Sequence, residues 1–303
     1  MAKLLTAEMA RINKKITLKS GEKRGYSLTR DAWRRFKRNK TAVVGVAVIV
    51  ILILAAVFAK FIIPYDVNAL DPVAAFQRPS LQRLFGTDMY GRDMFSRCIY
   101  GARYSLPIGL ICMCTELLTG GLLGMISAYF AGKFDMLFMR LIDIIQAIPG
   151  TLLAILVVAV LGTGLPQLIL AVTISFLPGG AKTVRAAIFT VKNNEYIDAG
   201  RLIGLSNFKL MLRHMLPNSV GYIIIQSVSS IPLAIMVVSS LSYLGLGIMP
   251  PTPEWGALLN ANRAYLQSYP YLVLFPGLMI FFTVLAFNLF GNGLRDALDP
   301  RLK

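Results

Sequence analysis

The sequence predicts an all-α integral membrane protein with six transmembrane helices. Two observations support this fold class: 56% of the 303 residues are hydrophobic, and the apolar residues gather in long blocks. One block, residues 42–59, is 18 residues long and contains no polar side chain. As a helix it would measure about 27 Å, close to the hydrocarbon thickness of a bilayer. Its 40-residue leader is too long for a cleaved signal peptide.

The six expected spans cover residues 41–63, 105–130, 137–161, 165–177, 220–248 and 271–290. The glycines at 120, 121 and 124 predict close helix packing in the second span. The fourth span is short. The run Pro178-Gly179-Gly180 is expected either to end it or to bend it before the helix resumes toward Thr190.

The distribution of positive charge predicts the orientation. The net charge is +16, and 13 of the 31 Lys and Arg residues precede Thr41. With the N-terminus in the cytosol, 24 basic residues fall in cytosolic segments and 6 in outer segments. This bias follows the positive-inside rule, so both termini are expected in the cytosol of a bacterial cell and residues 64–104 outside the membrane. It also disfavours nucleic acid as the partner of the basic charge.

The leader, residues 1–40, carries a helical pattern near its end. Ser27 or Thr29 can cap a helix in which Leu28, Trp33 and Phe36 lie on one side and the cations between residues 34 and 38 mostly on the other. Such a helix suits the inner membrane interface, with its cations near anionic headgroups. A solvated basic tail is the alternative.

The cysteine and histidine content gives no sign of a metal or another cofactor. Cys98, Cys112 and Cys114 form no disulfide framework, and no second Cys or His pair supplies the spacing of metal ligands. Buried thiols that behave as small hydrophobic groups are the expectation.

Residues 193–218 form a polar, basic stretch between apolar blocks, with the pattern of two short helices around a glycine. Asn193 or Asn194 can cap the first helix, with Glu195 in its first turn and Arg201 in its last. Gly204 is placed to leave that helix through a left-handed conformation.

The faces of these two helices can also be predicted. In the first, Tyr196, Ala199, Gly200 and Ile203 share a face whose middle is small enough for close approach by another surface. The second can be capped by Ser206 or Asn207 and is expected to end at Pro217. The spacing of its residues predicts two faces, with Phe208, Leu212 and Met215 on one and Lys209 and Arg213 on the other. An amphipathic hairpin resting on the bilayer or on its own bundle is the alternative interpretation.

This stretch resembles the conserved cytoplasmic loop of ABC-importer permeases: Glu-Ala-Ala, three residues, Gly, nine residues, Ile, one residue, Leu-Pro. Here Asp198-Ala199-Gly200 takes the place of the first triplet, Gly204 follows, and His214 precedes Leu216-Pro217. Asp198, Gly200 and His214 depart from the pattern. His before Leu-Pro is usual in the dipeptide and oligopeptide branch, so the departures indicate that branch.

Five further matches resemble the C-type permease subunit of peptide importers. They are Ala32-Trp33-Arg34-Arg35-Phe36 with Arg38-Asn39-Lys40, the run from Phe85-Gly86-Thr87-Asp88 to Ser105-Leu106, Met139-Arg140 with Asp143 and Pro149, Pro253-Glu254-Trp255-Gly256, and Leu294-Arg295-Asp296 with Leu298-Asp299-Pro300-Arg301. Together with the loop they extend over most of the chain.

The resemblance implies a type I ABC-importer permease fold, with a core over residues 105–303 and a coupling loop over residues 181–218. It implies four partner proteins: a second permease, two cytosolic ATPases that bind ATP and Mg, and an outer binding protein. Coupling to the ATPase would fall to these residues: Glu195, Tyr196, Asp198, Ala199, Gly200, Arg201, Gly204, His214, Leu216 and Pro217. The implied substrates are dipeptides or oligopeptides, and nickel or a metal chelate is the alternative.

The chain itself shows no complete phosphate loop, so the energy source must be a partner. Two rival classes have weaker support. An intramembrane enzyme lacks its constellation, because there is one histidine, no His-Glu-x-x-His and no Gly-x-Ser-x-Gly. A channel would need a filter or charged ring and would leave the coupling loop unexplained.

Three residues are candidates for the translocation path. Glu116 falls in the middle of a span, where an ionisable group is a functional candidate by default. It can line a cavity or lie between helices, or it can be protonated and packed. Pro149 and Pro232 are candidate bends near the path. Asp143, three residues after Arg140, is expected to form an ion pair with it.

Two outer segments, residues 64–104 and 249–270, are expected to contact the binding protein or to gate the outer mouth. The candidate contact residues are Asp88, Arg92, Asp93, Glu254 and Trp255. A packed cap on the helix bundle is the alternative.

Overall fold

A computed structural model describes residues 28–298, and this part of the chain is helical apart from loops and an isolated bridge between Thr87 and Asp93. The first helices are α2 (Leu28–Arg38), α3 (Lys40–Val57), α4 (Ala59–Ile62), α5 (Met94–Phe130), α6 (Gly132–Gln146), α7 (Gly150–Leu161) and α8 (Leu165–Lys192). They are followed by α9 (Glu195–Leu202), α10 (Asn207–Leu210), the π-helical turn η2 (Met211–Met215), α11 (Leu216–Tyr243), α12 (Trp255–Asn262) and α13 (Tyr271–Leu298). Short 3₁₀ turns are η1 (Pro72–Ala74) and η3 (Arg263–Tyr265).

The expectation of six spans is confirmed when one broken span is counted. Five helical stretches of the described chain are long and apolar enough to cross a bilayer, and there are six if α6 and α7, bent by 80°, are counted as one span. Pro149 is the N-cap of α7, and the residue before a proline is disfavoured in the α conformation. The break therefore falls where the proline interrupts the third predicted span.

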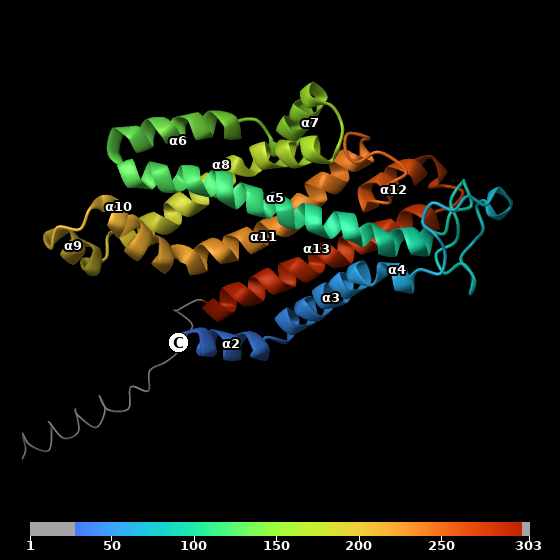
Figure 1. Cartoon of the computed structure of the whole chain (residues 1–303), viewed down its shortest axis with the longest axis horizontal. Coiled ribbons are helices and arrows are strands. Elements are labelled where there is room, and N and C mark those ends of the chain that lie inside the picture. The colour runs from blue at the N-terminus through green and yellow to red at the C-terminus, as the bar shows by residue number, and fades with distance from the viewer. Residues whose placement is uncertain (1–27, 299–303) are drawn as a thin grey trace, which may run out of the picture.

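The long helices run side by side along the longest axis of the molecule (Figure 1). The loop helices α9 and α10 lie at one end of this axis, and the segment between α4 and α5 lies with α12 at the other. The α5–α8 pair forms the centre of the bundle. A Cβ on Gly120 would lie 2.7 Å from the carbonyl oxygen of Leu177, and one on Gly124 would collide with that of Ala181. The predicted close packing of these glycines is confirmed.

The run at 178–180 does not end the fourth helix, so the boundary predicted at residue 177 is wrong, whereas the alternative of a helix that resumes toward Thr190 agrees with α8. α8 continues as one helix from Leu165 to Lys192. Packing against α5 stabilises this stretch, because Pro178 is buried and the missing side chain of Gly180 lets α5 approach. A Cβ there would lie 3.0 Å from the carbonyl oxygen of Glu116.

The N-terminal helices pack on the last helix of the chain. Phe36 is buried and meets Phe290 edge-on with ring centroids 5.9 Å apart. Asn39 caps α3 with its side-chain oxygen, while its amide donates to Asp296 at 3.2 Å. The helix predicted in the leader is present as α2, beside the end of α13 (Figure 1). Ser27 lies outside the described residues, as does the side chain of Thr29.

Candidate functional site

The first loop helix, α9, is anchored to the bundle by one buried side chain. Ile197 is completely buried in a cluster that includes Val191 of α8, Leu210 of α10 and Met215 of η2. The helix begins after Asn194, as predicted, but the Asn194 side chain makes no capping hydrogen bond. Because a buried isoleucine contributes about 1.5–3 kcal/mol, α9 is held against the ends of three other helical elements.

Gly200 packs inside the chain. A Cβ at this position would lie 2.7 Å from Cδ2 of Leu210. The close approach that this glycine allows is therefore made by α10 of the same chain. The face predicted to be shared by Tyr196, Ala199, Gly200 and Ile203 is divided, because Gly200 is buried while the other three are exposed. Ala199 keeps a surface free for a partner, and Gly200 does not.

The turn between the two loop helices has the predicted left-handed glycine. Gly204 has φ +80°, and no atom lies within 4 Å of where its Cβ would be. The N–H of Gly204 donates to the carbonyl of Arg201 at 3.0 Å, and the N–H of Leu205 donates to that of Gly200 at 3.1 Å. This pair of bonds is the Schellman arrangement, which satisfies the last carbonyls of α9.

The second loop helix starts as predicted but does not end at Pro217. The Ser206 hydroxyl accepts from the N–H of Lys209 at 3.3 Å, and α10 continues through η2 into α11. A proline in a regular helix would clash with the carbonyl four residues earlier, here that of Arg213. The π-turn directly before Pro217 accommodates the ring, so the helix passes through without ending.

His214 lies within this π-turn and is partly buried, and its carbonyl accepts from the Asn218 side chain at 2.6 Å. The π-turn also changes which side chains face inward. Leu210, Met211 and Met215 are buried, whereas Phe208 and Leu212 are exposed and line one groove, so the prediction that Met215 shares their face is wrong. Leu216 packs against the same cluster as Met215, and Pro217 is exposed.

The loop exposes large apolar side chains that the sequence reasoning missed or undervalued. Leu202 is 89% exposed and Ile203 is 78% exposed, and both lie at the end of α9. Tyr196 and Phe208 are exposed as well. Exposed apolar side chains that lie together on a polar loop are typical of a surface that contacts another protein or a membrane. The exposure of Leu202 could have been predicted from its position, because it directly precedes Ile203 at the left-handed turn of Gly204.

The charged residues of α9 lie at its surface. Asp198 and Arg201 form an exposed ion pair with 2.9 Å between oxygen and nitrogen. Such pairs contribute about 0–1 kcal/mol, so this one adds little to the stability of the helix. Glu195 is exposed in the first turn and Arg201 lies in the last, both as predicted, where each charge is favourable to the helix dipole.

Glu116 lies between three helices. It is partly buried on α5, above Gly179 and Gly180 of α8, and it borders a cavity of about 20 Å³ that is also lined by Gln226 of α11. Within the described chain no hydrogen-bond partner reaches its Oε2 atom. Glu116 therefore lies between helices and beside a small cavity, and the structure leaves both of its predicted roles open. The cavity has room for about one water molecule.

The two candidate bends differ. Pro149 is exposed and marks the 80° break between α6 and α7. Pro232 is buried inside α11, which continues to Tyr243. Asp143, near the same break, pairs with Lys182 of α8 at 2.6 Å, so its predicted ion pair with Arg140 is wrong. Asp143 can reach Lys182 because α6 and α8 lie side by side.

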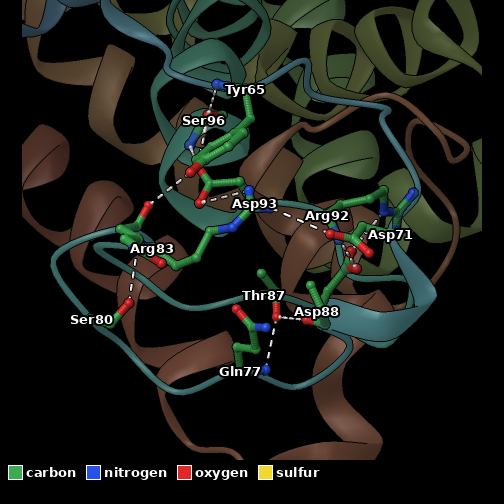
Figure 2. Close-up of polar contacts among 12 residues, drawn as sticks. Tyr65, Asp71, Gln77, Ser80, Arg83, Thr87, Asp88, Arg92, Asp93 and Ser96 are labelled. Atoms are coloured by element: carbon green, nitrogen blue, oxygen red, sulfur yellow. Dashed lines mark hydrogen bonds and ion pairs between the residues drawn. The ribbon is translucent and has the colours of Figure 1, made fainter.

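The outer segment is a packed cap held by buried charges (Figure 2). Arg92 donates from Nε to Asp88 at 2.7 Å, and both side chains are buried. Asp93 caps α5 by accepting from the N–H of Ser96 at 2.8 Å. Arg97 is also buried and donates to the carbonyls of Val67 and Pro251. These residues hold the cap together.

Glu254 and Trp255 are completely buried in the same region. Glu254 caps α12 by accepting from the N–H groups of Gly256 at 2.9 Å and Ala257 at 2.8 Å, and from the Ser105 hydroxyl. Burial raises the pKa of the Glu254 carboxyl, and these hydrogen bonds oppose that shift. The Trp255 indole donates to the carbonyl of Cys98 at 2.9 Å.

The outer residues predicted to contact a binding protein are therefore turned inward. Asp88, Arg92, Asp93, Glu254 and Trp255 are all buried within the chain, so as surface contacts they are wrong in this conformation. The alternative of a packed cap describes the structure. Charged residues are usually exposed, which is why the sequence predicts a surface here. Within the cap, however, each of these carboxylates accepts a hydrogen bond and can therefore be buried.

The arrangement is that of a membrane bundle with an anchored helical loop at one end and a polar cap at the other. Comparisons with known protein families agree. Residues 120–303 match the family described as binding-protein-dependent transport system inner membrane component, and residues 27–79 match the N-terminal TM domain of oligopeptide transport permease C. The first match covers more than half of the chain. The chain therefore belongs to this family of inner-membrane permeases, in the C-type branch.

Individual relatives support the assignment. The chain is 46% identical over 272 residues to the glutathione transport system permease protein GsiD of Escherichia coli O6:K15:H31 (strain 536 / UPEC), which covers 89% of this chain and 90% of the relative. The identity and coverage are the same for GsiD of Shigella boydii serotype 4 (strain Sb227).

Solved structures give the fold. A chain of the inward-facing MetNI methionine ABC transporter superposes with a TM-score of 0.58 at 15% identity, covering 68% of this chain and 98% of that one. A second crystal form of the same transporter gives a TM-score of 0.56. The fold is the type I importer permease fold. The protein is a multi-pass transporter subunit, not an enzyme, and nucleotide hydrolysis belongs to partner ATPases.

Proposed function

We propose that the chain forms one half of a translocation path for small peptides of the glutathione type, and that α9 is the helix that couples this path to an ATPase. It pairs with a second permease above two cytosolic ATPases and receives substrate from an outer binding protein. The relatives are glutathione permeases, which favours a peptide substrate over the nickel alternative. The membrane is the bacterial inner membrane, with both termini cytosolic.

The observation that carries the coupling role is the exposed apolar end of α9. Leu202 and Ile203 are presented to solvent while Ile197, on the same helix, is completely buried in the bundle. A docking helix needs both properties, because a force applied at its outer face must reach the transmembrane helices. The buried cluster joins α9 to α8, α10 and α11 and provides that connection.

The path itself is proposed to run beside Glu116 and the α6–α7 break at Pro149. Glu116 keeps an unpartnered carboxylate oxygen at the contact of three helices. Ionisable groups within membrane bundles mark substrate pathways, because their burial in lipid is costly. Pro232 is buried inside α11, and we do not include it in the proposed path.

A co-purification experiment tests the coupling role. Leu202→Asp together with Ile203→Asp should release the ATPases from the membrane complex, while the second permease stays bound. Val73→Asp is the matched control, because Val73 is an equally exposed apolar residue on the outer segment. Wild-type yield of ATPase with the double variant would contradict the docking role of α9.

A further inference from the structure

A cavity of about 630 Å³ opens between α6 and the adjoining ends of α5 and α8. Its wall combines two kinds of side chain. The cationic residues are Arg140, Arg185 and Lys192, and the apolar ones are Met136, Met139 and Phe189. The importer function described above makes no use of this cavity.

The carboxylates at the cavity already have partners. Asp135 is held by Arg185, whose Nε donates to Oδ1 at 2.6 Å, and it also accepts from the Ser127 hydroxyl. Asp143 is held by Lys182 at 2.6 Å. The cavity therefore contains acidic groups, but they are neutralised by neighbouring cations.

Two further cations of the described chain, Arg140 and Lys192, form no close ion pair there and interact with Asp143 and Asp135 only over a longer distance. Within the described residues no carboxylate lies within 4 Å of Arg140 or Lys192. Lys192 lies 4.8 Å from the centroid of the Phe189 ring, and Arg185 lies 4.7 Å from the same centroid. Cations from both α6 and α8 thus line an open, partly apolar cavity, and such a lining suits an anion with an apolar part.

A chain of aromatic rings lies along the α5–α6 turn, whose residues Ala131 and Gly132 also line the cavity. Tyr129 meets Phe130 at 4.9 Å, Phe130 meets Phe134 at 4.8 Å, and Phe134 meets Phe138 at 6.1 Å. The rings surround the turn at Ala131, where α5 ends and α6 begins. Aromatic side chains gather at the headgroup level of bilayers, and basic pockets between membrane helices there bind lipid headgroups.

We propose that this cavity binds the phosphate of an anionic phospholipid, with Arg140 and Lys192 as its ligands and an acyl chain along Met136 and Met139. Free inorganic phosphate has the same anionic chemistry, but it would leave the apolar wall unused. The inference goes beyond import and does not depend on the substrate. Only its assignment to the inner leaflet uses the orientation proposed above.

The test uses the purified permease–ATPase complex in nanodiscs of phosphatidylcholine with increasing fractions of phosphatidylglycerol. Phosphatidylglycerol should raise the melting temperature of the complex. Arg140→Gln with Lys192→Gln should raise the fraction needed for half of this shift by about tenfold. Lys133→Gln with Arg263→Gln removes two exposed cations outside the cavity and should leave it unchanged.

A charge-preserving pair guards against a folding artefact. Arg140→Lys with Lys192→Arg should keep the response to phosphatidylglycerol. The proposal is overturned if this pair loses the response, or if the double Gln variant keeps it in full. It is also overturned if inorganic phosphate in pure phosphatidylcholine nanodiscs reproduces the whole shift, because that result assigns the site to a free anion.

Discussion

Gly200 and Leu210 pack together where α9 meets α10, and a Cβ on the glycine would lie 2.7 Å from Cδ2 of the leucine. Leu210 is itself almost completely buried in the cluster that holds Ile197. The contact fixes the angle between α9 and α10. The two loop helices therefore form one unit that is packed against the ends of α8 and α11.

Replacing Gly200 by Val should separate α9 from α10 and reduce transport, because the added methyl groups meet Leu210. Overpacking of this kind costs about 1–3 kcal/mol. Gly221→Val is the matched control, since no atom lies within 4 Å of a Cβ at Gly221 in α11. Substrate uptake and the ATPase activity of the reconstituted complex measure the effect. Equal uptake by the two variants would show that the contact is dispensable.

Replacing Gly204 by Leu should uncouple ATP hydrolysis from transport and leave the protein in the membrane. The cost is conformational, about 1–2 kcal/mol, because φ is +80° and the surrounding space is open. Gly204→Asn should retain most transport, since asparagine tolerates the left-handed region. The ratio of substrate transported to ATP hydrolysed distinguishes the two variants. An unchanged ratio in Gly204→Leu would contradict the placement of the turn.

Reversing the charge of Arg92 should destabilise the outer cap rather than weaken a docking surface. The Arg92–Asp88 pair is buried, and breaking such a pair costs about 3–5 kcal/mol. Arg92→Glu should therefore lower the melting temperature of the purified protein. Arg263→Glu changes an exposed arginine on the outer side and is the control. A wild-type melting temperature with lost stimulation by binding protein would favour docking instead.

Glu254 gives the stability a pH dependence. Burial raises its pKa in the folded protein above the ordinary value near 4.5, so the folded state binds the proton more tightly than the unfolded state. Its contribution is full below that ordinary value and is lost as pH rises through the folded-state pKa. The melting temperature of wild-type protein should fall over this range relative to Glu254→Gln. Parallel curves for the two proteins would exclude Glu254 as the cause.

The sequence predicted where both loop helices begin and where the first one ends, because these signals are local. Asn194, Gly204 and Ser206 occupy the positions that helix ends favour, and the structure has helix boundaries at each. The span pattern was predictable for the same reason. Each depends on the residue type and its immediate neighbours, and on no contact with a distant segment.

The errors concern features that depend on distant contacts. α8 passes Pro178 because Gly180 lets α5 pack against it, and the π-turn before Pro217 alters the inward face of the second loop helix. Burial of the Arg92–Asp88 pair depends on the cap around it. Periodicity alone contains none of this information, and a charged run by itself predicts an exposed surface.

Site-directed crosslinking of the α9 tip tests the central claim most directly. Leu202→Cys in a Cys114→Ser background places one exposed thiol at the end of α9. The two remaining native thiols, Cys98 and Cys112, are buried. In membranes that contain the whole complex, a short bifunctional reagent should join this thiol to an ATPase subunit. The same reagent should form no crosslink between Val73→Cys and an ATPase subunit. Labelling of Leu202→Cys by an impermeant maleimide from outside the cell, with no ATPase crosslink, would contradict the claim.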